Sequence, residues 1–194
     1  MKQYMKKNKI LIILTALTII FIIIGIFIPS VLPKSINKEI EQNIKNLILR
    51  IKEKKQIDNS PSITYIGNIL TILIIWSLGI SIIGIPILLL YYSIKSLYIS
   101  LETILLLKNI KSCNILFIII YSIPSIINLV LLFIIIYYAC NYSIILIKTL
   151  FLKKDYSIKR ITLNYIKILI VMIVITSIST IIEIIIPKLL SNII

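Results

Sequence analysis

Three long stretches of this chain contain no charged residue, and this feature limits the folds that are open to it. The first stretch runs from Ile10 to Leu32 and has 23 residues. At about 1.5 Å per residue, a helix of that length crosses a hydrocarbon core of roughly 30 Å with some tilt. No small-residue cleavage site follows it, so we expect a retained transmembrane helix and not a signal peptide.

The other two stretches, Asn59 to Ile94 and Ser112 to Ile147, are each 36 residues long. A single helix of that length would measure about 54 Å and exceed the bilayer, whereas two full spans with a turn would scarcely fit. We therefore expect each stretch to break at residues that weaken a helix. The expected helix-break and packing residues are Gly79, Gly84 and Pro86 in the first of these stretches and Pro124 in the second.

The composition points to a membrane protein. Hydrophobic residues make up 59% of the 194 residues, and the mean hydropathy is +1.09. A net charge of +14 would suggest nucleic-acid binding in a soluble chain, but here the cations cluster beside apolar segments. We interpret them as orientation signals and expect the lipid bilayer as a partner, and no nucleic acid.

Basic residues cluster at the amino terminus and again between Lys148 and Arg160. The positive-inside rule places both clusters in the cytoplasm. The first span leads to an outer loop, so an odd number of crossings must return the chain to the second cluster, and three crossings satisfy this requirement. We predict an all-α transmembrane helix bundle forming a single membrane domain over residues 1–194, with the carboxyl terminus outside. The predicted spans are about 10–32, 63–79, 82–107, 115–147 and 161–187.

The segment from Lys34 to Gln56 has isoleucine and leucine at helical spacing, with Lys, Glu, Gln and Asn between them. This pattern predicts an amphipathic helix, over about residues 35–57, that is too polar to cross the membrane. Such a helix lies on the membrane surface or on the bundle, or it offers a docking face to a partner. Both alternatives require the same apolar stripe.

The residue types available for catalysis are few. The chain has no histidine, two cysteines and seven acidic residues, which removes most routes to a metal site or to a histidine-activated nucleophile. Cys113 lies in a short polar connection and Cys140 in an apolar run, so we expect no disulfide between them. We predict a protein that is not an enzyme and that holds no cofactor and no metal.

Helices interrupted by glycine and proline are also typical of transporter sites. A coupled transporter normally needs an ionisable group inside the membrane, and the possible functional acids are Glu102 and Glu183. Both lie near predicted span ends with lysines close in sequence, so we interpret them as interfacial residues or lysine partners. The alternative is a small secondary transporter or channel with its site at the broken helices.

Other residues inside the apolar stretches fit a packing role. Small residues four apart, such as Ser96 and Ser100, let helices approach closely. Tyrosines and Trp76 are interpreted as anchors at the membrane interface. The asparagines in apolar runs, which are expected to bond exposed carbonyls near the breaks, are Asn68, Asn128 and Asn141.

Four segments carry a family resemblance. The stretch WSLGISIIGIPILLLYYSIKSLYISLE, which contains Gly79, Gly84 and Pro86, resembles the G-x-x-x-x-G-x-P core of the bacterial stage II sporulation protein M family. The segment SIPSIINLVLLF looks like that family's second broken segment. Further on, LIKTLFLKKDYSIKRITLNYIKIL is similar to its basic cytoplasmic connector, and IIEIIIPKLL to its terminal glutamate and proline. The resemblance covers roughly residues 64–190.

This resemblance implies a function in endospore formation. Members of the family are multi-pass scaffolds that have no enzymatic activity of their own. They hold two membrane-anchored wall-degrading partners, stage II sporulation proteins D and P, at the sporulation septum during forespore engulfment. For this chain we therefore expect peptidoglycan hydrolases as partners, and we expect it in the cell membrane, at the septum and the engulfing mother-cell membrane.

Overall fold

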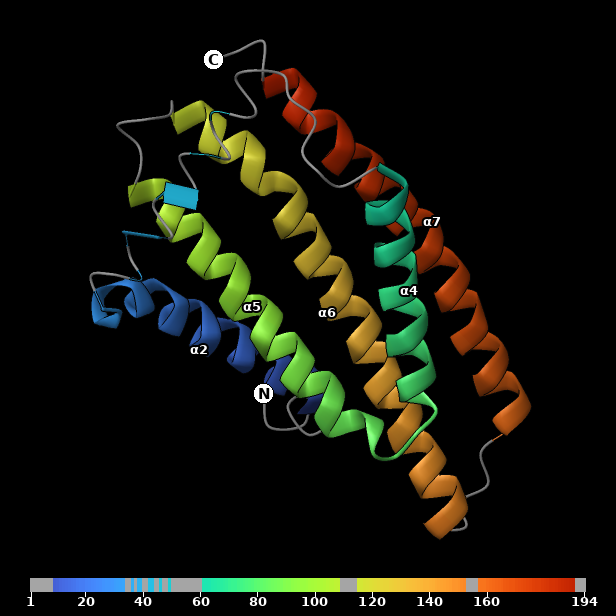
Figure 1. The fold of residues 1–194 in the computed structure, drawn as a ribbon. Helices are drawn as coiled ribbons and strands as arrows, with labels where there is room; N and C mark the ends of the chain where they lie inside the picture. Colours follow the sequence, from blue (N-terminus) through green and yellow to red (C-terminus); the bar gives the residue numbers. More distant parts are fainter. Residues whose placement is uncertain are drawn as a thin grey trace.

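In the computed structural model, the described residues are 9–33, 61–108, 115–152 and 157–190, with scattered positions between 36 and 49. Over these residues the chain is helical and has no strand (Figure 1). The long helices are α2 (Lys9–Val31), α4 (Pro61–Gly79), α5 (Gly84–Lys108), α6 (Ile115–Leu152) and α7 (Ile158–Leu190). All five are long and apolar enough to cross a membrane, so the predicted all-α polytopic bundle is confirmed.

Contacts between side chains give the direction of each helix. Thr18 bonds Tyr92, and Ser100 bonds the Ile22 carbonyl, so α2 and α5 run parallel. By contrast, α4 and α7 are antiparallel, as are α6 and α7 (Figure 1). The chain therefore alternates in direction from one long helix to the next, as five successive membrane crossings require.

A tight turn separates α4 from α5 at the predicted glycines. The helix α4 ends at Gly79 and α5 begins at Gly84. The Gly84 backbone passes so close to the Leu78 carbonyl group that an added Cβ would lie 2.6 Å from the carbonyl carbon. Pro86 falls in the first turn of α5, where a missing N–H costs no helical hydrogen bond.

The predicted break at Pro124 is wrong, because α6, which is 38 residues long, continues through this proline. A proline removes one backbone hydrogen bond, and neighbouring helices make this tolerable inside a membrane bundle. The helix is about 57 Å long at 1.5 Å per residue. This exceeds a hydrocarbon core of roughly 30 Å, and the last turns, from Lys148 on, follow the end of the charge-free stretch.

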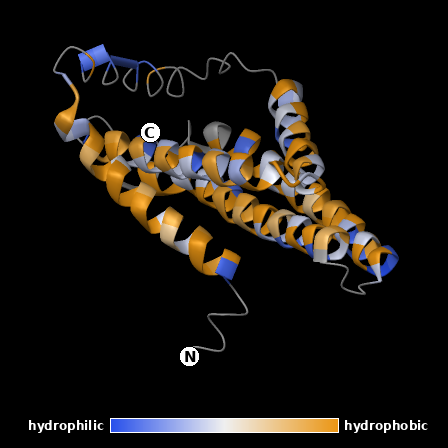
Figure 2. Cartoon of the chain, turned by 90° about the horizontal axis from the view of Figure 1, so that it is seen from below, coloured by the Kyte–Doolittle hydropathy of each residue, from blue (hydrophilic) through white to orange (hydrophobic). Residues whose placement is uncertain are grey.

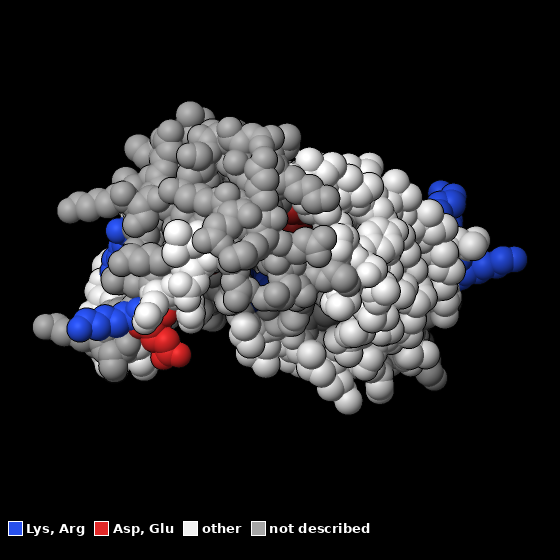
Figure 3. All heavy atoms as spheres, turned by 45° about the horizontal axis from the view of Figure 1, so that its top comes forward, with Lys and Arg blue, Asp and Glu red and all other residues white. Residues whose placement is uncertain are grey.

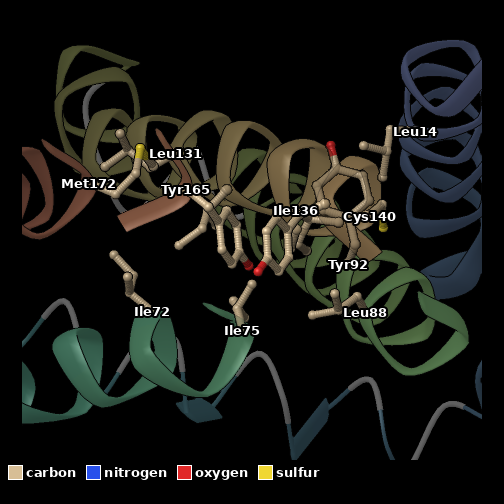
Figure 4. Close-up of a cluster of buried hydrophobic side chains, with 13 residues drawn as sticks. Leu14, Ile72, Ile75, Leu88, Tyr92, Leu131, Ile136, Cys140, Tyr165 and Met172 are labelled. Atoms are coloured by element: carbon tan, nitrogen blue, oxygen red, sulfur yellow. The ribbon is translucent and has the colours of Figure 1, made fainter. Parts of the chain in front are cut away.

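The core of the bundle contains several of the aromatic residues that the sequence suggested as interface anchors. Tyr142 and Tyr165 are buried and stack with their ring centroids 4.2 Å apart. Figure 4 shows Tyr165 within the cluster of buried apolar side chains. Trp76 stacks on the other side of Tyr165, at 5.5 Å. Tyr92 is also buried, with its hydroxyl 2.7 Å from Thr18 Oγ1. For Tyr92 and Tyr142 the interface interpretation is wrong, because each finds a ring or a hydroxyl partner on another helix.

The first helix is attached through a close contact at Ser100, one of the small residues that the sequence suggested for close packing of helices. A Cβ atom added at Gly25 of α2 would lie 2.7 Å from Ser100 Cβ of α5. The Ser100 hydroxyl donates a 2.8 Å hydrogen bond to the Ile22 carbonyl oxygen at the same place. Small residues on both helices therefore allow α2 to pack on α5.

Outward surfaces of the bundle are apolar, as expected for contact with lipid (Figure 2). In the view of Figure 3, most of the described surface carries no charged side chain. Two predictions fall largely outside the described residues. Cys113 is not among the described residues, since it falls between the end of α5 at Lys108 and the start of α6 at Ile115. Of the predicted amphipathic helix only scattered positions are described, and these are helical and exposed: Ile36, Lys38, Glu39, Gln42, Asn43, Asn46 and Leu49.

Candidate functional site

A cluster of polar side chains lies where α4, α6 and α7 meet. Glu183 Oε2 accepts a 3.2 Å hydrogen bond from Asn68 Nδ2 and a 3.3 Å bond from Asn128 Nδ2. The neighbouring Ser179 and Thr180 on α7 are buried and bond the same two amides. We call these five residues the Glu183 cluster.

The hydroxyl groups of the cluster orient the two amides. Thr180 donates its proton to the Thr176 carbonyl oxygen, so its oxygen can accept the 3.1 Å bond from Asn68 Nδ2. Ser179 donates a 2.7 Å bond to Asn128 Oδ1, which leaves the Asn128 N–H groups free to face Glu183. Both amides therefore present donors to one oxygen of the Glu183 carboxyl group.

The cluster lies inside the membrane-spanning part of the helices and not at their tips. Asn68 is seven residues after the start of α4 at Pro61, and Glu183 is seven residues before the end of α7 at Leu190. At 1.5 Å per residue, both lie about 10 Å from the helix ends. A carboxylate at this depth needs hydrogen-bond donors from the protein, because lipid offers none.

The second acidic residue belongs to the same region of the bundle. Tyr121 of α6 hydrogen-bonds the half-buried Glu102 carboxylate of α5. Glu102 lies close enough to Glu183 and Lys95 to interact electrostatically with both. The structure thus brings the two acids named from the sequence, which are 81 positions apart, into one electrostatic neighbourhood.

The partners of these residues differ from the sequence-based interpretation. Among the described side chains, Glu183 is bonded to amides of two other helices. Lys188, the lysine that follows it in sequence, lies outside the described side chains. Asn68 and Asn128 donate to this carboxylate and not to freed backbone carbonyls, whereas Asn141 does donate to a carbonyl, that of Tyr137, 3.0 Å away. The apolar-run asparagines were the signal for the cluster, but their partners lie on helices far away in sequence.

The four predicted helix-break and packing residues do not form part of the cluster. Gly79 and Gly84 flank the turn at the opposite end of α4, and Pro86 follows on α5. At Gly79, a Cβ would collide with the Tyr165 hydroxyl and lie 2.8 Å from Ala139 Cβ, so this glycine allows α4 to touch α6 and α7. Pro124 is buried inside α6, four residues before Asn128.

The chemistry of the cluster is that of a matched set of donors and acceptors. Across residues 9–33, 61–108, 115–152 and 157–190, no three His, Cys, Asp or Glu side chains gather in a way that could hold a metal ion. Glu183 and its amides form fixed contacts among three helices. This arrangement holds helices together, and it provides no pair of acid and base around an open space.

Comparisons with known proteins agree with the sequence resemblance. The family model described as stage II sporulation protein M matches residues 14–186. No curated protein and no solved structure matches the chain. The matched range includes the α4–α5 turn, Pro124, Glu102 and the whole Glu183 cluster.

Proposed function

Because this chain belongs to the stage II sporulation protein M family, we propose that it is a non-enzymatic membrane scaffold of the sporulation septum. It is a sporulation-related protein with five helices able to span a membrane. In the proposed role, it anchors membrane-bound peptidoglycan-degrading proteins of the sporulation D and P type. These partners thin the septal wall while the mother-cell membrane engulfs the forespore.

The observation that supports a scaffold best is the number of side-chain bonds between helices. The Glu183 cluster joins α4, α6 and α7. Ser143 of α6 donates to the Ser81 carbonyl in the α4–α5 turn at 2.7 Å, and Tyr165 of α7 donates to the Trp76 carbonyl at 2.9 Å. Helices tied in this way keep the connections between them at constant positions, as a docking platform requires.

The distribution of charge is consistent with a platform that faces the wall. Lys148, Lys159 and Arg160 lie at the end of the bundle where α6 ends and α7 begins. The positive-inside rule makes this end cytoplasmic. The Glu183 cluster lies nearer the opposite end, where α4 begins and α7 ends (Figure 1). In the proposed orientation, the connections on that side face the peptidoglycan.

The test is recovery of wall hydrolases with the protein from its native host. The chain, with an affinity tag, is extracted in mild detergent from cells that are forming the septum, and bound proteins are quantified by mass spectrometry. We expect peptidoglycan hydrolases with membrane anchors to be enriched over a control purification of an unrelated five-span protein. Equal recovery in both purifications, with the tagged protein folded, would contradict the scaffold.

Transport is the second candidate, because Glu102 and Glu183 both lie at membrane depth. The discriminating variant is Glu183→Gln, which keeps the side-chain shape and removes the charge. A scaffold with this change should still recruit hydrolases and support wall remodelling. If remodelling is lost while the protein level and the bound hydrolases stay normal, transport becomes the better explanation.

A further inference from the structure

A line of polar residues runs along one side of α5. Tyr91, Lys95, Tyr98 and Glu102 follow one another at spacings of four, three and four residues, so they share one helix face. Lys95 is exposed, and Tyr98 is 59% exposed. The apolar residues that α5 packs into the core, among them Leu88 and Tyr92, lie beside this line and do not cover it.

Lys95 lies near the middle of its transmembrane helix. It is 11 residues after Gly84 and 13 residues before Lys108, which places it about 17 Å and about 20 Å from the two ends of α5. An ammonium group exposed to hydrocarbon at this depth is unfavourable by several kcal/mol. Lys95 therefore requires a polar environment that hydrocarbon chains do not provide.

Contacts within the chain satisfy this requirement only in part. Lys95 Nζ lies 6.0 Å from the centre of the Tyr91 ring, at the outer limit of a cation–π contact. Glu102, its electrostatic neighbour, is nearly two turns away on the same helix and is bonded to Tyr121. Lys95 forms no salt bridge with any carboxylate in the part of the chain that the structure describes.

The line begins beside α4, where Tyr91 lies next to Thr71. The helices α4 and α5 meet at their turn and separate toward the other end of the bundle, with α6 behind them (Figure 1). Near the narrow end, the Thr71 side chain of α4 faces the Tyr91 hydroxyl. We call the polar surface formed by Thr71 of α4 and by Tyr91, Lys95 and Tyr98 of α5 the α4–α5 wedge.

We propose that the α4–α5 wedge is a docking site for a transmembrane helix of a partner that carries a carboxylate at mid-membrane depth. A carboxylate pairs with the Lys95 ammonium, and hydroxyls of Thr71 and Tyr98 are within the same wedge. A helix fits better than a lipid, because phosphate headgroups lie at the bilayer surface and Lys95 lies well over 10 Å from either end of α5. The inference deepens the proposed function, since anchored hydrolases bring transmembrane helices of their own.

The test uses a defined probe and not the natural partner. The purified full-length protein is placed in vesicles with a synthetic Leu/Ala-rich transmembrane peptide that has either Glu or Leu at its centre, and association is measured by energy transfer between dyes. We expect the Glu peptide to associate about fivefold or more tightly than the Leu peptide, the size of one interhelical polar contact. Lys95→Gln should remove this preference, and the matched control Lys108→Gln, at the end of the same helix, should keep it.

Other results would overturn the proposal. Equal association of the two peptides, or a preference that persists in Lys95→Gln, would show that the wedge does not select a carboxylate. Dependence on the phosphatidylglycerol content of the vesicles, with no dependence on the peptide's central residue, would assign Lys95 to lipid binding. Folding of each variant is checked by its thermal unfolding midpoint, because a folded Lys95→Gln is needed for either conclusion.

The outcome is separable from the test of the scaffold. If hydrolases are recovered with the parent protein but the Glu peptide shows no preference, the scaffold stands and the docking site is elsewhere. If the Glu peptide binds through Lys95 while no hydrolase is recovered from the host, the docking site at the wedge is supported and the proposed identity of the partners is wrong.

Discussion

Asn68 and Glu183 are 115 positions apart in sequence, and a 3.2 Å hydrogen bond joins the side-chain amide of the first to the carboxylate of the second. This bond ties the beginning of α4 to the end of α7. A second amide, that of Asn128, bonds the same carboxylate oxygen from α6. One acidic residue thus holds three helices that could otherwise slide in a uniformly apolar environment, where the hydrophobic effect gives no preference among neighbours.

Replacement of Glu183 by alanine should lower stability. The half-buried amides of Asn68 and Asn128 would then lose their shared acceptor, and a donor left unsatisfied costs about 1–3 kcal/mol. Asn68 would keep its bond to Thr180. We expect a lower thermal unfolding midpoint in detergent and a smaller loss for Glu183→Gln, which retains one acceptor oxygen. Glu39→Ala is the control, because Glu39 is exposed. An unchanged midpoint in Glu183→Ala would show that the cluster does not contribute to stability.

Gly79 and Gly67 should respond differently to the same change. At Gly79, an alanine Cβ would meet the Tyr165 hydroxyl and Ala139, and overpacking of this kind costs about 1–3 kcal/mol. At Gly67, an added Cβ has no atom within 4 Å, so Gly67→Ala should be neutral or raise stability by up to about 1 kcal/mol through helix propensity. Thermal unfolding of both variants measures the contrast, and similar losses in the two would contradict the packing of α4 against α6 and α7.

Gly84→Leu should reduce the amount of folded protein. The added Cβ would collide with the backbone carbonyl of Leu78, and backbone in a tight turn cannot move aside as a flexible side chain can. Size-exclusion chromatography of a fluorescent fusion measures the monodisperse fraction, and Ile83→Leu, at an adjacent position that is 72% exposed, is the control. If Gly84→Leu gives a normal yield and binds hydrolases normally, the close packing of Gly84 against the Leu78 carbonyl is contradicted.

Thr176→Val should stabilise the protein. The Thr176 hydroxyl is buried and forms no hydrogen bond within the described part of the chain, so an apolar group of the same shape removes an unsatisfied polar atom. We expect a gain of about 1 kcal/mol. Thr180→Val, one turn away, should have the opposite effect, because Thr180 accepts from Asn68 and donates to the Thr176 carbonyl. A loss of stability in Thr176→Val would indicate that its hydroxyl is satisfied in the membrane.

The two cysteines test the orientation of the bundle. Cys113 lies between the end of α5 and the start of α6, on the side predicted to be outside, whereas Cys140 is 1% exposed within α6. An impermeant maleimide added to intact cells should therefore label Cys113 but not Cys140. The Cys140→Ser variant should label like the parent, and Cys113→Ser should not label. If Cys113 is labelled only after the cells are permeabilised, the orientation is inverted.

The sequence alone was sufficient for the features that depend on a local run of residues. Long charge-free stretches determine that the chain crosses a membrane, because a helix must be long enough to cross the hydrocarbon core. The glycines at 79 and 84 mark the turn between α4 and α5, since a close backbone approach leaves no room for a side chain. The order of the four resembling segments was enough to indicate the family.

The break expected at Pro124 shows where local reasoning ends. A proline weakens a helix in isolation, but the surrounding helices and the extension of α6 past the hydrocarbon core decide whether the helix continues. The burial of Tyr92 and Tyr142 is similar, because the same aromatic residue suits a membrane interface or a protein core. Hydropathy does not distinguish these two environments.

Only the tertiary structure decided which polar residues meet. Asn68, Asn128 and Glu183 stand in three separate apolar runs, and no spacing along the chain relates them. Their contact depends on how α4, α6 and α7 cross, which is set by small residues and rings at the helix contacts. The same is true of the residues near Lys95, because Thr71 of α4 lies beside Tyr91 of α5 only through the way the two helices meet. Sequence determines the depth of a residue in the membrane, and packing determines its neighbours.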